Sequence, residues 1–284
     1  DKTKNRVNTV IENDLGYIFG EVPKMISSLI DDEILTKKVI KNNVKKQKSP
    51  SASYTQKVKE EMEYIFSGSF KMGSEMNTGG DMDEWPTHNV TLDDFYIDKY
   101  EVTKEKFEKV MGYNPSGVKG CNTCPVDNVT WFEADEYCRK VNKRLPTEAE
   151  WEYSCRSGTS TIFHYGNTLS SDKSNFNGSK PYGGAPQGIA RNKSIPVGNF
   201  EPNNWKLYDM HGNVSEWCSD WYSENYYGNS ENKNPKGPKE GKFKVVRGGS
   251  WRDNANTLRI TNRTSYNPSI RLKSIGFRCA KDAD

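Results

Sequence analysis

The stretch 157–243 limits how this chain can fold more than any other part of the sequence. It has little periodic apolar pattern and is rich in glycine, asparagine and proline, residues that favour turns. Loops of this length inside one domain usually carry function or are tied down by side chains. The chain also has 7 Trp, 15 Tyr and 11 Phe, whose large side chains can build a core between irregular segments. We therefore expect an α+β domain with few regular strands, in which residues 157–243 are almost all loop.

Short strands are expected on both sides of this stretch. Residues 64–66 and 70–72 flank Ser67-Gly68-Ser69, a spacing that predicts a β-hairpin. Further strands are expected at 90–92, 95–97, 244–248 and 276–280. The two segments near the C-terminus would close the domain.

Three threonines mark the starts of predicted helices. Thr103, Thr130 and Thr147 each precede a segment of helical spacing, and a threonine hydroxyl can accept a hydrogen bond from the first free backbone N–H groups. Thr147 and Glu150 also have the spacing of a capping box, which predicts a helix over 148–156.

Residues 1–56 differ in pattern from the rest and predict a helical arm followed by a linker. Apolar residues recur at helical spacing up to about residue 35, and 49–53 is a linker signal. The basic run 41–48 is open to two interpretations, a polybasic membrane contact or a helix end that faces water. The main domain is expected at 57–284.

The bulk properties exclude several classes of function. A net charge of +3 is too small to indicate binding to nucleic acid or to an anionic membrane surface. The sequence has no run of 18 apolar residues that could span a bilayer. It also contains no GxSxG, phosphate-loop or HExxH signature.

Three motifs resemble signatures of the formylglycine-generating, sulfatase-modifying family. They are FKMGS at 70–74, RLPTEAEWEY at 144–153 and LYDMHGNVSEW at 207–217, and the resemblance runs in order from about Met62 to Lys281. It implies a C-type-lectin-like α+β fold of the formylglycine-generating enzyme subtype, elaborated by long irregular segments.

The same resemblance implies that the family's chemistry is missing. In the family, two thiols near the C-terminus bind copper and activate oxygen, and a hydroxyl or amide cannot replace a thiolate in that role. This chain has no cysteine between Cys218 and Cys279, so no copper is expected. Other oxidative members bind iron through histidines on an added helical domain, and 1–56 contains no histidine. We therefore expect a protein that is not an enzyme.

For the cysteines, the resemblance implies a disulfide between Cys138 and Cys279. Cys155 also matches a family disulfide position, but its partner would lie near 259–263, where there is no cysteine. It is either a buried free thiol or the partner of Cys218.

The pair Cys121 and Cys124 has CxxC spacing, for which a loop-tip disulfide or two inert thiols are favoured. A zinc site needs further ligands nearby, and the three histidines are isolated in the sequence. A thioredoxin-like site needs a βαβ context, which the pattern does not predict.

The resemblance also implies a structural calcium site. Four residues fall where the family binds calcium through two side chains and two carbonyls: Asp209, Gly212, Val214 and Glu216. The alternative is that Asp209 caps the turn and Glu216 pairs with an arginine. A second family site would begin near Asn175 and Phe176, but 185–189 lacks the expected aspartate.

The tripeptide Glu201-Pro202-Asn203 matches one with which some lectins bind mannose through calcium. The companion Trp-Asn-Asp triplet is missing. Sugar binding by that mechanism is not expected.

The segment between Trp251 and Arg271 has neither helical nor strand periodicity. It is rich in Asn, Thr, Ser and Tyr, a mixture typical of antibody paratopes, where Tyr supplies contact area and small polar residues supply adaptable hydrogen bonds. Arg259, Arg263 and Arg271 are spaced as anchors that would hold the segment through bidentate hydrogen bonds. The alternative is an ordinary surface loop rich in asparagine.

Here the chain is similar to the variable proteins of diversity-generating retroelements, treponemal ones in particular. In those proteins adenine-directed mutagenesis rewrites asparagine codons of a C-terminal repeat, which would correspond to about 246–280. The resemblance implies four unmutated positions, Asn254, Asn256, Asn262 and Asn267. It also implies six rewritten ones, Ala255, Leu258, Ile260, Thr264, Ser265 and Tyr266.

The expected function is therefore non-catalytic binding of varied protein or other macromolecular targets. Apolar contact would come from Trp251, Leu258, Ile260 and Tyr266, and polar groups from Asp253, Asn254, Asn256 and Asn262. The resemblance implies a bacterial, cell-surface, outer-membrane or periplasmic monomer that meets a membrane only through an N-terminal lipid anchor. Two alternatives remain: an enzyme of altered chemistry that takes a peptide or small thiol, and a constant structural protein of the envelope.

Overall fold

The protein was analysed as a computed structural model that describes residues 61–76, 79–117 and 120–283. The chain divides into two units, Asp1–Gln56 and Lys57–Asp284, and the described residues all belong to the second. The predicted arm at 1–56 and its basic run lie outside the described residues. Within the described ranges, no helix is long and apolar enough to cross a membrane.

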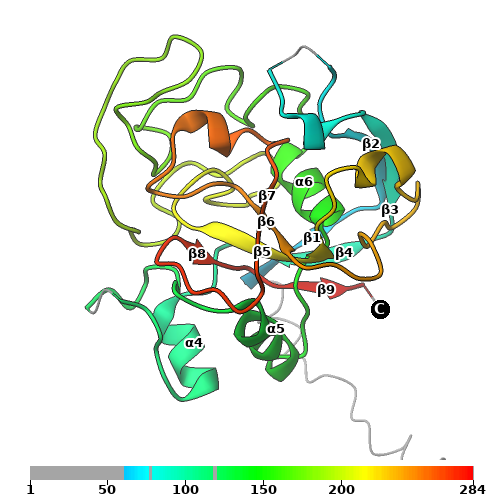
Figure 1. Cartoon of the computed structure of the whole chain (residues 1–284). Coiled ribbons are helices and arrows are strands. Elements are labelled where there is room, and N and C mark those ends of the chain that lie inside the picture. Colours follow the sequence, from blue (N-terminus) through cyan, green and yellow to red (C-terminus); the bar gives the residue numbers. More distant parts are fainter. Residues whose placement is uncertain (1–60, 77–78, 118–119, 284) are drawn as a thin grey trace, which may run out of the picture. The chain divides into compact units, whose positions relative to one another are not determined.

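The strands within the described residues form three small sheets (Figure 1). The first has the order β1-β4-β9, with bounds Met62–Ile65, Phe95–Asp98 and Ala280–Asp282. The second pairs β2 with β3, at Gly68–Met72 and His88–Leu92. The third has the order β7-β6-β5-β8, at Thr264–Tyr266, Lys244–Arg247, Ser215–Trp221 and Ile275–Gly276. This mixture of short strands, helices and long loops confirms the predicted fold class.

The hairpin predicted between 64–66 and 70–72 is wrong. β1 pairs with β4 and β2 pairs with β3, and the register continues across the break, since Ile65 lies opposite Phe95 and Gly68 opposite Leu92. The two segments are therefore consecutive parts of one bent antiparallel ribbon. The carboxylate of Asp94 bridges the break, accepting hydrogen bonds from Tyr64 Oη and from Ser67 N, each at 2.5 Å.

All three predicted helix starts are confirmed. The helices are α4 (Lys104–Met111), α5 (Trp131–Lys140) and α6 (Glu148–Arg156), and each N-cap threonine accepts a hydrogen bond from a backbone N–H in the first turn. The capping boxes of α5 and α6 are complete, because Glu133 and Glu150 return a bond to the N-cap backbone. These starts depend only on residues three positions apart.

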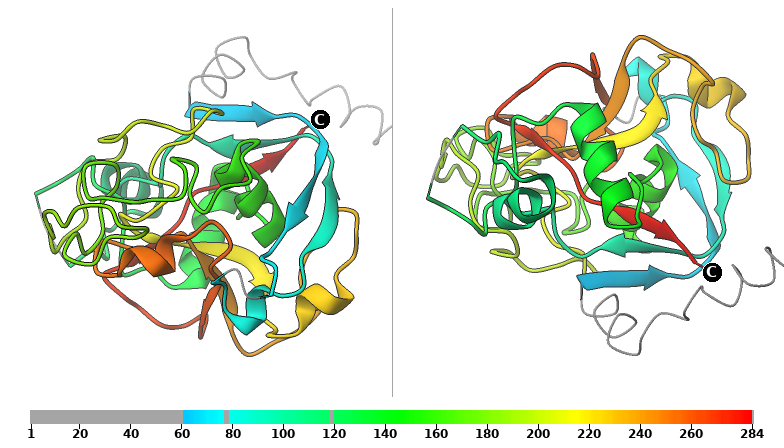
Figure 2. Two further views of the ribbon diagram at one scale, coloured as in Figure 1. Left: turned by 90° about the horizontal axis from the view of Figure 1, so that it is seen from above. Right: turned by 90° about the horizontal axis from the view of Figure 1, so that it is seen from below.

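Residues 157–243 are mostly loop, as predicted, but they contain one strand that the sequence pattern did not predict, β5. It runs through the middle of the third sheet, with α5 packed on one side and α6 on the other (Figures 1 and 2). Trp217 lies in the core on the α5 side and Cys218 in the core on the α6 side, and both are fully buried. A strand buried on both faces has no polar–apolar alternation, which is why the pattern missed it. The same stretch contains the short 3₁₀ helix η2 (Tyr226–Asn229).

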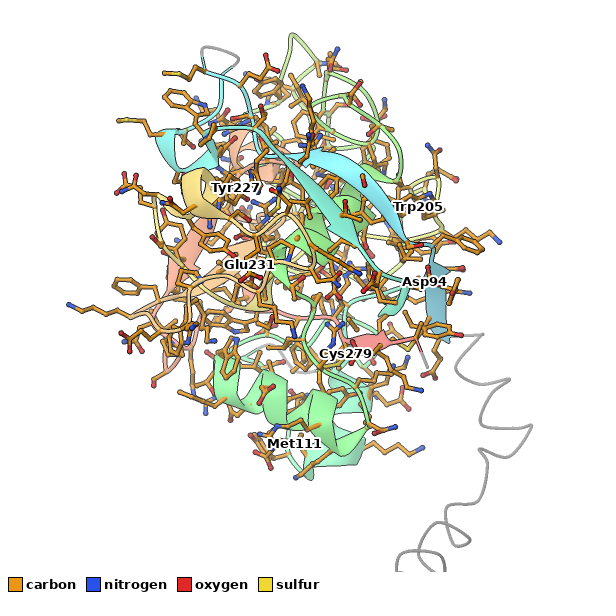
Figure 3. The ribbon with its side chains drawn as sticks, turned by 90° about the vertical axis from the view of Figure 1, so that its right-hand side faces the viewer. Asp94, Met111, Trp205, Tyr227, Glu231 and Cys279 are labelled. Atoms are coloured by element: carbon orange, nitrogen blue, oxygen red, sulfur yellow. A yellow bond between two sulfur atoms is a disulfide. The ribbon has the colours of Figure 1, made fainter. Side chains whose placement is uncertain are left out.

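The predicted strand at 276–280 is divided in two. β8 pairs in parallel with β5, whereas β9 crosses to the first sheet and pairs with β4. Between them, Cys279 is bonded to Cys138 of α5, with an S–S distance of 2.09 Å (Figure 3). Cys121 and Cys124 form the second disulfide, and Cys155 and Cys218 are buried free thiols. A bond between Cys155 and Cys218 is therefore excluded.

The long loops are tied down by a third apolar cluster. Phe163, Leu169 and Phe176 of the loop region pack against Ala255 and Leu258 of the C-terminal segment. One side of the C-terminal segment is thus packed into the core. This packing of Ala255 and Leu258 determines which of the segment's other side chains can face solvent.

Candidate binding surface

The C-terminal segment from Gly248 to Ser274 lies on one side of the domain (orange to red in Figures 1 and 2). After β6 the chain turns at Gly248 and Gly249, which have φ values of 89° and 64°. A Cβ atom on Gly249 would lie 2.6 Å from Leu258 Cδ1, so glycine is required there for both conformation and space. The chain then forms the 3₁₀ helix η3 (Ala255–Leu258) and β7.

Two buried arginines anchor the segment through bidentate ion pairs. Arg259 donates from Nη1 and Nη2 to the two carboxylate oxygens of Glu84, at 2.8 and 2.7 Å. Arg263 donates from Nε and Nη2 to those of Glu148, at 2.7 and 2.9 Å. The fork geometry matches the planar guanidinium to the planar carboxylate and fixes orientation as well as position. Arg271 instead makes a single contact with its carboxylate, 2.7 Å from Nη2 to Glu133 Oε1, so the predicted bidentate pair is wrong there.

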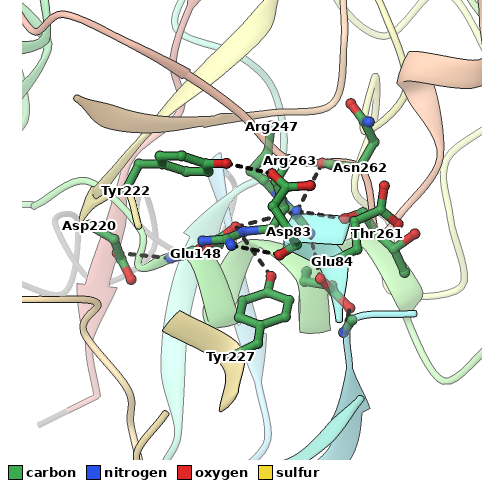
Figure 4. Close-up of polar contacts among 12 residues, drawn as sticks. Asp83, Glu84, Glu148, Asp220, Tyr222, Tyr227, Arg247, Thr261, Asn262 and Arg263 are labelled. Carbon is green, nitrogen blue, oxygen red and sulfur yellow. Dashed lines mark hydrogen bonds and ion pairs between the residues drawn. The ribbon is translucent and has the colours of Figure 1, made fainter. Parts of the chain in front are cut away.

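Arg247 of β6 holds the backbone between η3 and β7. Its guanidinium donates to three consecutive carbonyl oxygens, those of Ile260, Thr261 and Asn262, at 2.8, 3.1 and 2.8 Å (Figure 4). It also pairs with Glu152 of α6. The loop is therefore held by a side chain of the scaffold through its main chain, which does not depend on the loop's own side chains.

The charges under the segment balance one another. Burial alone would raise the pKa of Glu148, but the guanidinium groups of Arg263 and Arg247 lower it below its ordinary value. The pKa of Glu84 is lowered in the same way, against its burial, by Arg259. Both carboxylates are thus charged at neutral pH and complete a network of buried ion pairs.

Three of the four predicted template asparagines lie on the surface: Asn254, Asn256 and Asn267. Their side-chain oxygens accept local hydrogen bonds, for example from Asn177 Nδ2 at 3.0 Å and from Arg259 Nε at 3.2 Å. Their side-chain nitrogens donate to no other residue in the described part of the chain, so they are available to a ligand. Trp251, Asp253, Thr264, Ser265 and Tyr266 are half-buried.

Four residues of the predicted contact set face inward, and their assignment to the ligand surface is wrong. Ala255, Leu258 and Ile260 are fully buried, because η3 turns one side onto the loop core and Ile260 reaches the core on the α6 side. Asn262 is 6% exposed and donates from Nδ2 to Asp81 Oδ2 at 3.3 Å. Periodicity could not separate these positions, because neither a helix nor a strand spans them.

Asp253 serves the fold of the segment. Its Oδ2 accepts hydrogen bonds from Ser250 N at 2.9 Å and Ser250 Oγ at 2.6 Å, closing the turn after Gly249. The important residues that the sequence did not single out are Arg247, Glu84 and Glu148. Their partners lie 13 to 175 positions away, and no local signal marks such pairs.

The two carboxylates expected to bind calcium have other partners within the protein in this geometry. Both carboxylate oxygens of Glu216 are held by Arg278, at 2.7 Å to Nε and to Nη2, which is the alternative pairing weighed above. Asp209 Oδ2 accepts from Gly198 N at 2.6 Å, and burial raises the pKa of Asp209 to about 6. Asn175, proposed for the second site, bonds through Nδ2 to Lys193 O and Asn213 Oδ1.

Comparison with known proteins finds relatives of this chain whose names indicate different functions. The family model described as the sulfatase-modifying factor enzyme 1-like domain matches residues 46–283. Serine/threonine-protein kinase Pkn1 of Chlamydia trachomatis is 35% identical over 250 residues, which cover 78% of this chain and 38% of that protein. The formylglycine-generating enzyme of Mus musculus is 32% identical over 277 residues, covering 77% of this chain and 74% of the enzyme. The chain therefore spans well under half the length of the chlamydial relative.

Among solved structures, Treponema denticola variable protein 1 superimposes with a TM-score of 0.68 at 26% identity. The match covers 78% of this chain and 95% of that protein. The fold described above is thus shared over almost the whole of a treponemal variable protein.

Proposed function

Because the chain belongs to the sulfatase-modifying factor enzyme 1-like family, with its C-type-lectin-like α+β fold, yet has no cysteine between Cys218 and Cys279, we propose that it is a non-catalytic ligand-binding protein. Its binding surface is the outward side of the C-terminal segment, with a sequence that is diversified to bind varied macromolecular targets. One observation carries the proposal. The segment's backbone is held by buried guanidinium groups, while the side chains of Asn254, Asn256 and Asn267 are exposed and donate no hydrogen bond to another described residue.

The state of the thiols supports the absence of catalysis. Burial raises the pKa of both Cys155 and Cys218, so neither is a thiolate at neutral pH. The other four cysteines are joined in disulfides. An enzyme of altered chemistry is the rival, and oxygen consumption in the presence of a cysteine peptide would reveal it.

The rigid frame supports diversification. A preorganised backbone lowers the entropy lost on binding, so side-chain changes can retune affinity without unfolding the domain. The likeness to a treponemal protein named as variable agrees with this role. A surface location, an N-terminal lipid anchor and a monomeric state belong to the same proposal.

Sequencing the gene in sister isolates tests the proposal. Among the ten positions predicted to be template or rewritten codons, differences should gather at those that are exposed or half-buried. These are Asn254, Asn256, Thr264, Ser265, Tyr266 and Asn267. They should spare the anchors Arg247, Arg259 and Arg263. An unchanging segment would instead support a constant structural protein of the envelope.

A further inference from the structure

The strand inside the C-terminal segment is an edge strand. β7 comes first in the order β7-β6-β5-β8, so it pairs with β6 on one side and with no other described strand on the other. An open edge presents unpaired N–H and C=O groups, which natural proteins usually cover or blunt. Here the edge lies in the proposed binding surface.

The direction of the main-chain groups follows from the pairing of β6. Tyr222 N donates to Phe243 O at 2.8 Å, so Phe243 directs its main-chain polar groups toward β5. These groups point alternately to the two sides along a strand. Lys244 and Val246 therefore direct theirs to the other side, toward β7.

In β7, Tyr266 lies opposite Lys244 and Thr264 lies opposite Val246, so these two residues bond to β6. Ser265 stands between them and directs its N–H and C=O away from β6. By this alternation neither group bonds to β6, and outside the strand ladders neither has a backbone hydrogen-bond partner among the described residues. The segment thus offers one donor and one acceptor at an open sheet edge.

Three exposed apolar side chains flank the two ends of β7: Met82, Phe132 and Phe243, which are 72%, 52% and 44% exposed. Met82 lies at the N-terminal end, since the neighbouring Asp83 accepts a bond from Arg263 Nη1 at 2.8 Å. Phe132 lies at the C-terminal end, since the N–H of the preceding Trp131 donates to Pro268 O at 2.9 Å. Phe243 directly precedes the residue opposite Tyr266. They come from three different parts of the chain, and the contacts of their neighbours place them near the ends of β7.

We infer that the ligand of this surface contributes an extended polypeptide segment that pairs with β7 and places apolar side chains against Met82, Phe132 and Phe243. This inference rests on the binding function proposed above. A partner of Ser265 must present an acceptor and a donor at strand spacing, about 4.8 Å away, and an extended peptide backbone does so whatever its sequence. Main-chain hydrogen bonds do not depend on side-chain identity, so this part of the affinity is kept when the side chains of the segment change. The varied side chains then select the partner.

Proline substitution tests the edge geometry first. Ser265→Pro removes an N–H that the fold does not use, so the melting temperature should stay within a few degrees of the parent. Thr264→Pro is the matched control, because it removes an N–H that bonds to β6 and should lower the melting temperature clearly. Equal losses for the two variants would contradict the assignment of the open edge.

A library of linear dodecapeptides selected against the full chain supplies the binding probe. Selected peptides should lose affinity about tenfold for Ser265→Pro, as for one lost hydrogen bond, and much less for Ser265→Ala. Their binding should also fall for Phe243→Ser. Binders that ignore Ser265→Pro but respond to Asn254→Tyr would overturn the strand pairing and leave the proposed function standing. Failure to select any linear peptide would overturn the inference as well.

Hydrogen exchange decides the case in which Ser265→Pro does not fold. The amide of Ser265 should exchange fast in the free protein and become protected when a selected peptide is bound. Protection in the free protein, or no change on binding, would overturn the inference. Binders that respond neither to this edge nor to the asparagines would count against the proposed function itself.

Discussion

Arg263 of the C-terminal segment and Glu148 in the first turn of α6 form a buried bidentate ion pair, with Nε 2.7 Å from Oε1 and Nη2 2.9 Å from Oε2. The pair joins residues 115 positions apart. It holds the start of β7 against the helix. The backbone of the half-buried residues Thr264 to Tyr266 is therefore fixed relative to α6.

We expect Glu148→Gln to lower the free energy of unfolding by about 3–5 kcal/mol, because it leaves a buried guanidinium without its counter-charge. Urea unfolding measures the change. Arg271→Gln is the control, since Arg271 is 44% exposed and its pair with Glu133 should contribute less than about 1 kcal/mol. Similar losses for the two variants would contradict the role given to the buried pair.

Combined substitution of Asn254, Asn256 and Asn267 by serine should leave the melting temperature nearly unchanged, because these side chains face solvent. Leu258→Ala should instead cost about 2–5 kcal/mol, since its side chain fills the loop core. Thermal unfolding of both variants separates the outward from the inward positions. A drop of many degrees in the triple variant would assign the asparagines to the structure.

Gly249→Ala should destabilise the protein more than Gly112→Ala. Both glycines have positive φ, but a Cβ atom at Gly249 would meet Leu258 Cδ1 at 2.6 Å, whereas at Gly112 it meets nothing within 4 Å. The control therefore measures the conformational cost alone, about 1 kcal/mol. If chemical denaturation gave equal losses, the tight turn before η3 would not be as described.

Burial raises the pKa of Asp220 to about 7, above the unfolded value of 3.8. A carboxyl group shifted this way contributes stability below pH 4 that is lost as the pH rises toward 7. We expect Asp220→Asn to reduce the fall in unfolding free energy between pH 5 and pH 8. Denaturation at several pH values tests this, and an unchanged slope would show that Asp220 is not the group responsible.

Calcium should change the melting temperature of the domain little, because a calcium ion at the 209–216 turn would have to displace Arg278 from Glu216. Thermal unfolding in calcium and in a chelator measures this. A rise of several degrees with calcium, lost in Asp209→Ala, would show that the turn rearranges to bind the ion.

The local features were predictable from the sequence because their causes lie within a few residues. Thr103, Thr130 and Thr147 start their helices, since a hydroxyl reaches a backbone N–H only two or three positions ahead. The fold class followed from the motifs and the long aperiodic stretch, and the missing thiols could be read directly.

Only the tertiary structure decided which part of the segment meets solvent. Leu258 and Ile260 turn inward because cores assembled from distant loops and strands receive them, and Asn262 is buried beside Asp81. The strand β5 was missed because both its faces are covered. The anchors Arg247 and Arg263 find their carboxylates on α6, about 100 positions away. Burial and ion pairing depend on which segments meet in space, whereas capping and turns depend on neighbours along the chain.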